Sequence, residues 1–221
     1  MKKLLSYIIP FIVEKRKGKL SGELQVALEN GRFVLNTKEV NYSFGGLHTI
    51  FRKTFAKLEF EKRKFNNVLI LGFGTGSVAE LLVETYQCEG KITGIERDKV
   101  VIDLAKEYFE VDRFRNLNLI HDEASLFLDR VKEQFDLIII DVFVGTKIPP
   151  QLETDKFLES LRLKTSKDGL VLFNRAYFDD KTREASEKML KRMNVTVGPT
   201  DLLPIKAYGL RNCILMSRSS H

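Results

Sequence analysis

The chain has 221 residues, of which 43% are hydrophobic and 30% are charged, and its formal net charge is +6. This length suits one α/β domain with a small addition, and the composition excludes a disordered, collagen-like or disulfide-rich chain. Cys88 and Cys213 show no CxxC spacing and no signal peptide is evident, so we expect reduced thiols in a cytoplasmic protein.

Positive charge is concentrated in the first part of the chain. Residues 1–65 hold 14 Lys/Arg against 6 Asp/Glu, whereas residues 66–221 hold 22 against 24. A basic lobe can face nucleic acid, anionic lipid or an acidic substrate. Because no aromatic residues alternate with the basic ones, we favour a solvated lysine-rich face and expect no nucleic-acid partner. The apolar run 4–13 is too short to span a bilayer and contains Pro10, so we expect no membrane partner either.

The first segments predict a small antiparallel β-lobe. The apolar run predicts a short helix followed by an edge strand, and apolar and polar residues alternate over roughly 10–14, 23–29 and 32–37. Asn30-Gly31 between the last two is a strong hairpin signal, since both residues tolerate positive φ. A helix then runs to about Leu58, with Leu47, Ile50, Phe51 and Phe55 on one face. We therefore divide the chain into a lobe with its linking helix, 1–58, and a second unit, 59–221.

From residue 66 strands alternate with helices, which is typical of a parallel sheet. The last two strands follow one another without a helix, so we expect an antiparallel hairpin at one sheet edge. The predicted fold is α/β, a doubly wound, mostly parallel seven-stranded sheet with a small N-terminal antiparallel β-lobe. The predicted strands are 67–71, 91–96, 117–121, 135–141 (the most apolar and therefore central), 170–174, 195–197 and 212–217, and the predicted helices are 77–86, 100–109, 124–131, 155–163 and 181–193.

A glycine loop joins the first of these strands to its helix. Gly72, Gly74 and Gly76, with Thr75 between the last two, allow a tight turn and a close approach of a ligand to the helix N-terminus. A dinucleotide fingerprint would need glycine at position 77, where this chain has Ser77. The GxGxG spacing therefore indicates an S-adenosyl ligand rather than NAD.

Acidic residues end the next strands of the predicted sheet. Glu96 lies 20 residues beyond Gly76, where a carboxylate can accept hydrogen bonds from both ribose hydroxyls. Asp122 can accept from an adenine amino group and can also cap the following helix. Arg97 and Glu123 adjoin these two residues and complete the predicted cofactor site.

Asp141 ends the most apolar strand, at the edge where open α/β sheets place their ligands. A carboxylate there is costly to bury without a partner or a role, so Asp141 is our candidate for the catalytic residue as well as a cofactor contact. The candidates for the substrate pocket are Tyr42, His48, Phe143, Asn174 and Tyr177. Three histidines and two cysteines form no metal-ligand cluster in the sequence, so we expect no metal.

At these residues the chain resembles the spermidine synthase family, within the class I S-adenosylmethionine-dependent methyltransferase fold. The resemblance rests on the motifs 68–74 and 95–101 and on Tyr42 and His48 before the glycine loop. Ile70 stands where ordinary methyltransferases carry an acidic residue and polyamine synthases an aliphatic one. Two positions differ: Thr75 replaces an acidic residue of the family's loop, and after Asp141 the second carboxylate of a DxxD pair is replaced by Val144.

The resemblance implies a transferase that uses S-adenosylmethionine or its decarboxylated form. Acidic pairs hold a dicationic polyamine and help to deprotonate the attacking amine, so their loss disfavours polyamine chemistry. We expect methyl transfer to an unidentified small molecule. Aminopropyl transfer from decarboxylated S-adenosylmethionine and a non-catalytic S-adenosyl-binding module remain the alternatives. Polyamine synthases commonly dimerise, and we expect the apolar N-terminal segment to form such an interface.

Overall fold

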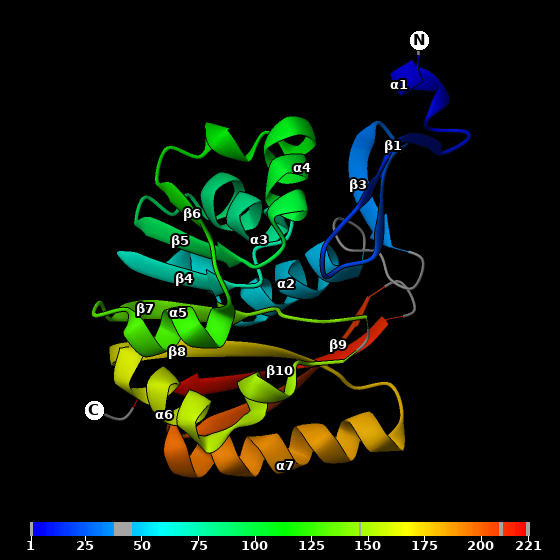
Figure 1. Cartoon of the computed structure of the whole chain (residues 1–221). Helices are drawn as coiled ribbons and strands as arrows, with labels where there is room; N and C mark the ends of the chain where they lie inside the picture. Colours follow the sequence, from blue (N-terminus) through cyan, green and yellow to red (C-terminus); the bar gives the residue numbers. More distant parts are fainter. Residues whose placement is uncertain (1, 38–45, 146, 208–209, 220–221) are drawn as a thin grey trace.

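The computed structural model describes residues 2–37, 46–145, 147–207 and 210–219 (Figure 1). A short helix α1 (Lys2–Leu5) precedes a three-stranded antiparallel sheet of β1 (Phe11–Lys17), β2 (Glu23–Glu29) and β3 (Arg32–Thr37). Asn30 and Gly31 have φ of 50° and 76°, so the predicted hairpin forms for the predicted reason. The edge strand β1 is longer than the expected 10–14, and residues 14–17 pair with β2 beyond a bulge.

Helix α2 (Gly46–Lys57) leads into a seven-stranded sheet in the order β6-β5-β4-β7-β8-β10-β9, which confirms the predicted α/β class. β7 lies in the middle of the sheet, as its apolar sequence predicted. Strands β4 to β8 run parallel, and β10 is antiparallel to both β8 and β9. The strands are β4 (Asn67–Leu71), β5 (Lys91–Glu96), β6 (Leu117–His121), β7 (Phe135–Ile140), β8 (Thr165–Ala176), β9 (Thr200–Ala207) and β10 (Leu210–Arg218).

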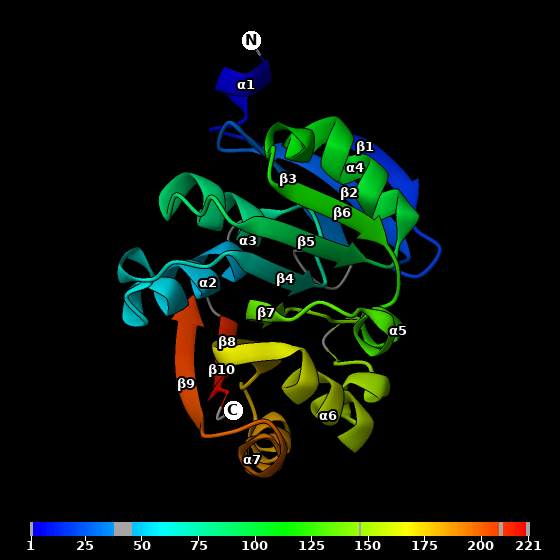
Figure 2. The same cartoon turned by 90° about the vertical axis from the view of Figure 1, so that its left-hand side faces the viewer.

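Helices cover both faces of this sheet, as Figure 2 shows for α2 and α3 on one side and α5 and α6 on the other. One buried cluster joins the lobe, α2, α3 and α4 to one sheet face, and a second joins α5, α6 and α7 to the opposite face. The remaining helices are α3 (Ser77–Glu80, continued by a π-helical turn over Leu81–Thr85), α4 (Lys99–Phe109), α5 (Ala124–Arg130), α6 (Asp155–Lys164) and α7 (Asp180–Thr196), with 3-10 turns at Phe60–Lys62, Val111–Arg113 and Pro150–Glu153.

The strand predicted at 195–197 is wrong, because α7 continues through these residues to Thr196. The Val197 backbone N–H donates a 2.8 Å hydrogen bond to the carbonyl of Met193, and both side chains are buried against the sheet. This packing overrides the strand preference of the β-branched residues. The edge hairpin is nevertheless present, formed by β9 and β10, so its type was predicted correctly and its first strand was misplaced.

The division of the chain at residue 58 stays a prediction. Ile50, Phe51 and Phe55 of α2 share one buried cluster with Leu24 and Leu35 of the lobe, and with residues of the large sheet.

Among the described residues, every helix is too short or too polar to span a bilayer. Cys88 and Cys213 are both free cysteines, and Cys213 is buried.

Candidate active site

A cavity of about 740 Å³ lies where the parallel strands end. Its floor comes from the residues that follow β4, β5, β6 and β7, which confirms that the carboxyl ends of these strands meet at one edge. The turn between β1 and β2 forms one wall, and residues after β8 and at the start of β10 form another. The volume suits a ligand the size of a nucleoside derivative with room for a small second molecule.

The glycine loop turns sharply after β4. Gly72 has φ of +82°, and the backbone N–H groups of Gly72 and Phe73 donate to the carbonyl of Ile95 at 3.0 and 2.9 Å. A Cβ on Gly72 would lie 2.3 Å from the backbone oxygen of Asp141, so only glycine can stand there. Gly76, with φ of +90°, directly precedes α3. The loop that follows β4 therefore lies against the end of β5 and against Asp141, just beyond β7.

Two hydroxyl groups beside this loop have no partner within the described residues. Thr75 and Ser77 both line the cavity, and their Oγ1 and Oγ atoms are buried without a hydrogen bond. A buried hydroxyl without a partner is unfavourable, so each is a position where a polar ligand atom is expected. This observation fits the polar tail of an S-adenosyl ligand. It also gives a use to Thr75, which stands where the resembled family carries an acid.

Glu96 ends β5 and is buried, with 9% of its surface exposed. The backbone N–H of Gly74 donates to Oε2 at 3.0 Å and that of Asp98 donates to Oε1 at 2.9 Å. Burial raises the pKa of Glu96, and the hydrogen bonds from Asp98 and Gly74 oppose this rise. Because each carboxylate oxygen can accept a further hydrogen bond, the fixed carboxylate suits two neighbouring hydroxyl groups such as those of a ribose.

Asp122 and Glu123 have different roles at the start of α5. Glu123 is the N-cap, since its side chain accepts from the backbone N–H of Leu126 at 3.0 Å. Asp122 lines the cavity and pairs with Arg130 of the same helix. The capping role considered for Asp122 therefore belongs to its neighbour, which leaves Asp122 at the cavity wall. Arg97 lines the cavity as well, beside Glu96.

Asp141 is half-buried just beyond β7, and its Oδ1 accepts a 2.8 Å hydrogen bond from the side-chain amide of Asn174. Burial raises the pKa of Asp141 to about 6, although this hydrogen bond lowers it. Within the described residues no partner is found for Oδ2 of Asp141. A carboxylate with this pKa and one available oxygen can hold a cationic group or accept a proton near neutral pH.

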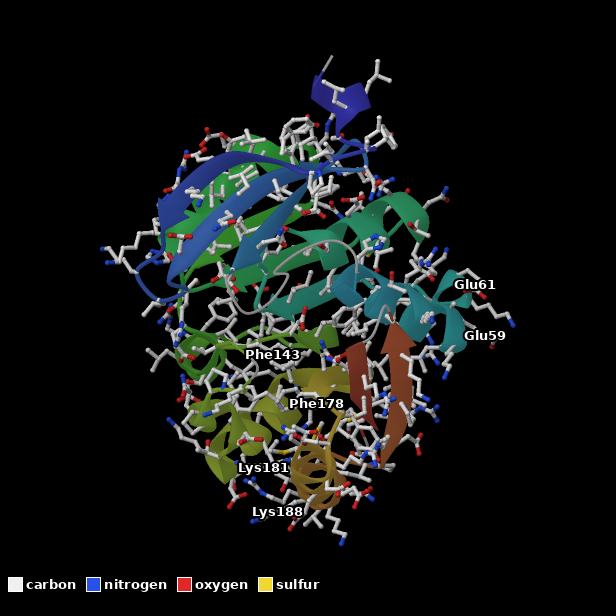
Figure 3. The ribbon with its side chains drawn as sticks, turned by 90° about the vertical axis from the view of Figure 1, so that its right-hand side faces the viewer. Glu59, Glu61, Phe143, Phe178, Lys181 and Lys188 are labelled. Atoms are coloured by element: carbon white, nitrogen blue, oxygen red, sulfur yellow. The ribbon has the colours of Figure 1, made fainter. Side chains whose placement is uncertain are left out.

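Aromatic side chains also line the cavity. Phe143 and Phe178 line the cavity, and in Figure 3 both lie on the viewer's side, between the β1–β3 lobe and α7. His48 and Tyr177 are not among the cavity residues. His48 is half-buried on α2, where burial and nearby arginines lower its pKa. The ring of Tyr177 contacts Arg183 of α7. Asn174 does not line the cavity but is hydrogen-bonded to two residues that do, Asp141 and Asn212, and Gly76 is not a lining residue either. Tyr42 lies outside the described residues.

Several cavity residues were not anticipated. The turn Leu20–Glu23 arrives from the lobe, and Phe178, Arg211 and Asn212 arrive from the ends of β8 and β10. The glycines at 18 and 22 mark a turn in the sequence but do not say where it docks. Phe178 directly follows Tyr177, a predicted pocket residue, and this adjacency was the nearest indication of Phe178 in the sequence. Among the described residues, no group of three or more His, Cys, Asp or Glu side chains forms a metal-ligand cluster.

Comparison with known proteins identifies the family of the chain. A family model described as the Spermine/spermidine synthase domain matches residues 53–210. A polyamine aminopropyltransferase of Vibrio vulnificus is 32% identical over 126 residues, which are 56% of this chain and 42% of that protein. An eEF1A lysine and N-terminal methyltransferase homolog of Drosophila melanogaster is 25% identical over 126 residues, or 53% of this chain and 19% of that protein. The chain thus spans less than half the length of either relative.

A solved structure shows the same fold. A probable spermidine synthase of Corynebacterium glutamicum superposes with a TM-score of 0.77 at 17% identity, covering 94% of this chain and 80% of that one. Since the family model spans well over half of the chain and the whole architecture agrees, the resemblance seen in the glycine loop and the strand-end acids is confirmed. The chain belongs to the spermine/spermidine synthase family, within the class I methyltransferase-like fold.

Proposed function

We propose that this chain transfers a methyl group from S-adenosylmethionine to a small-molecule nucleophile. The observation that carries the proposal is the composition of the wall beyond β7. Asp141 is followed by Val142, Phe143 and Val144, all of which line the cavity. A diamine has two positive charges to satisfy, whereas this stretch of wall offers one carboxylate. An acceptor with one reacting nitrogen or oxygen and an apolar body matches it better.

The choice of donor follows from the cavity's positive charges. Arg97 and Arg211 both line the cavity, and within the described residues neither guanidinium has an ion-pair partner. S-adenosylmethionine carries an α-carboxylate that such a group can bind, and the decarboxylated form does not. The two arginines therefore favour the carboxylated donor.

In methyl transfer the protein has little covalent chemistry to supply. The nucleophile's lone pair forms a bond to the methyl carbon as the carbon–sulfur bond breaks and leaves its electron pair on sulfur. The sulfonium is already activated, so the residues of the cavity mainly align the two reactants and exclude water. Asp141 accepts the proton that an amine or hydroxyl acceptor must lose. Glu96, Asp122 and the glycine loop hold the nucleoside portion of the donor.

A second function is favoured by the curated relatives. The Vibrio protein is named a polyamine aminopropyltransferase, and the same reaction here would use decarboxylated S-adenosylmethionine with Asp141 as the lone acid. A non-catalytic module would bind a donor without turning over any acceptor. We also infer a homodimer, since polyamine synthases commonly dimerise, and we place its interface at the apolar N-terminal segment of this chain.

Calorimetric titration with S-adenosylmethionine, its decarboxylated form, methylthioadenosine and NAD tests the proposal without a known acceptor. We expect the carboxylated donor to bind about tenfold or more tightly than the decarboxylated one, which is the effect of one charge-assisted contact. Turnover with a panel of small amines, putrescine included, should release S-adenosylhomocysteine. Preferential binding of the decarboxylated donor with release of methylthioadenosine would establish aminopropyl transfer instead.

A further inference from the structure

The turn between β1 and β2 covers one side of the cavity. Gly18 donates its backbone N–H to the carbonyl of Gly22 at 2.8 Å, which closes the turn. Leu20, Ser21 and Gly22 then line the same cavity as Glu96 and the glycine loop. The lobe thus contributes a wall to a site whose other residues belong to the large sheet.

One carboxylate attaches this turn to the sheet. Oδ2 of Asp98 accepts hydrogen bonds from the backbone N–H groups of Leu20 and Ser21, both at 3.2 Å, and from the Ser21 hydroxyl at 3.0 Å. Asp98 is only 1% exposed, and no ion pair with it occurs among the described residues. Although burial raises the pKa of Asp98, these hydrogen bonds hold it below its ordinary value. The buried charge is therefore stabilised by the turn itself.

Asp98 also belongs to the donor side of the site. Its Oδ1 accepts from the backbone N–H of Val100 at 3.1 Å and so caps helix α4. Its own backbone N–H donates to Glu96 at 2.9 Å, and the other oxygen of Glu96 holds Gly74. Two neighbouring carboxylates thus connect the turn, the start of α4 and the glycine loop.

We propose that Asp98 is a positioning residue that clamps the β1–β2 turn over the donor, so that the turn forms part of the site before the donor arrives. The identity of the donor rests on the function proposed above. The two oxygens of Asp98 separate the roles, because Oδ1 caps the helix and Oδ2 holds the turn. A turn that is already ordered loses no further conformational entropy when the donor binds, so the clamp increases affinity.

Two substitutions release the turn from opposite sides. Asp98→Asn keeps an oxygen that can cap α4, since asparagine caps as well as aspartate, but its amide nitrogen cannot accept from three donors. Gly18→Ala leaves Asp98 intact, yet a Cβ at residue 18 would lie 2.5 Å from its Oδ2 and would displace the carboxylate. Asp103→Asn is the matched control, because Asp103 lies on the same helix and forms a surface ion pair with Lys99.

Limited trypsin digestion without any ligand tests the clamp. Lys17 ends β1 and Lys19 lies within the turn, and both side chains are exposed. Cleavage after Lys19, identified by mass spectrometry, therefore reports opening of the turn. We expect this cut to be about tenfold faster in Asp98→Asn and Gly18→Ala, the loss expected for hydrogen bonds to a charged group, and unchanged in Asp103→Asn. An unchanged rate in both of the first two variants would overturn the clamp.

Calorimetry with S-adenosylmethionine and methylthioadenosine tests the link to the site. We expect the dissociation constant of both ligands to rise about tenfold in Asp98→Asn and Gly18→Ala and to stay unchanged in Asp103→Asn. Faster cleavage with unchanged ligand affinity would overturn the positioning role. If the unmodified protein binds neither ligand, the proposed function fails, whereas the digestion still decides whether the clamp exists.

Discussion

The side-chain amide of Asn174 donates a 2.8 Å hydrogen bond to Asp141, and its oxygen accepts a second 2.8 Å bond from Asn212. Asn174 is fully buried, so the pair of amides fixes one oxygen of the only carboxylate on its stretch of the cavity wall. β10 runs antiparallel beside β8, which places Asn212 within reach of Asn174. The edge hairpin therefore supports the residue on which the proposed chemistry depends.

Replacing Asp141 with asparagine should reduce kcat by about 100-fold or more, the usual contribution of a general base. The amide oxygen can still accept from Asn174, so we expect the site to keep its geometry and the donor's dissociation constant in calorimetry to rise by no more than about tenfold, the loss of one charged contact. Asp201→Asn, at an exposed position on β9, is the control and should keep full activity. Turnover by Asp141→Asn at the unmodified rate would remove the catalytic assignment.

The pH dependence of the reaction should report the protonation of Asp141. Burial raises the pKa of this carboxyl to about 6, and the base works only when deprotonated, so kcat/KM for the acceptor should fall as the pH drops below about 6. The hydrogen bond from Asn174 lowers that pKa. In Asn174→Ala the fall of kcat/KM at low pH should therefore begin at a higher pH. A fall that begins at the same pH or at a lower one would contradict this account.

Replacing Glu96 with glutamine should weaken donor binding by about 10- to 100-fold, because charged acceptors make the stronger hydrogen bonds. The amide also keeps a single oxygen for the two backbone donors, Gly74 and Asp98, that the carboxylate now holds. Calorimetry with methylthioadenosine isolates the nucleoside part of this effect. Glu59→Gln, at an exposed ion pair with Lys62, serves as the control. Unchanged affinity in Glu96→Gln would exclude the ribose role.

Gly94 of β5 faces the ring of Phe73, which follows β4 and lines the cavity. A Cβ at residue 94 would lie 2.4 Å from the ring, so Gly94→Ala must push the ring away. We expect donor affinity to fall about tenfold, as for other overpacked positions, and to recover in part when Phe73→Leu is added to Gly94→Ala. Calorimetry on the single and double variants checks this, and donor binding by Gly94→Ala at full strength would show that Phe73 is not part of the site.

Within the described residues, eight of the thirteen exposed large apolar side chains lie in the first 20 residues. Leu4, Leu5, Tyr7, Ile8, Ile9, Ile12, Val13 and Leu20 are all exposed. Such a patch marks an interaction surface, and we expect a homodimer at micromolar concentration by size exclusion with light scattering. The double variant Ile8→Ser, Ile12→Ser should shift the mass toward the monomer. Val195→Ser, at an 89% exposed position on α7, should not. A monomeric mass for the unmodified protein would refute this expectation.

The sequence by itself determined the fold class and the floor of the cavity. The glycine loop, Glu96, Asp122 and Asp141 each lie at the end of a predicted strand or directly after it, and parallel strands bring their carboxyl ends to one edge whatever the details of packing. Local backbone preference was also sufficient for the hairpin at Asn30-Gly31. It was insufficient at 195–197, where burial of Met193 and Val197 keeps β-branched residues in a helix.

Only the tertiary structure decided how the walls of the cavity are built. Ser21 and Asp98 are 77 residues apart, and Asn174 and Asn212 are 38 apart, so no local pattern links them. Their contacts depend on where the lobe docks and on the order in which β8, β10 and β9 pair. Strand-end positions follow from chain direction alone, whereas these pairings follow from the summed packing of distant side chains. That is the physical reason why the acidic residues at the strand ends could be predicted and the residues that position them could not.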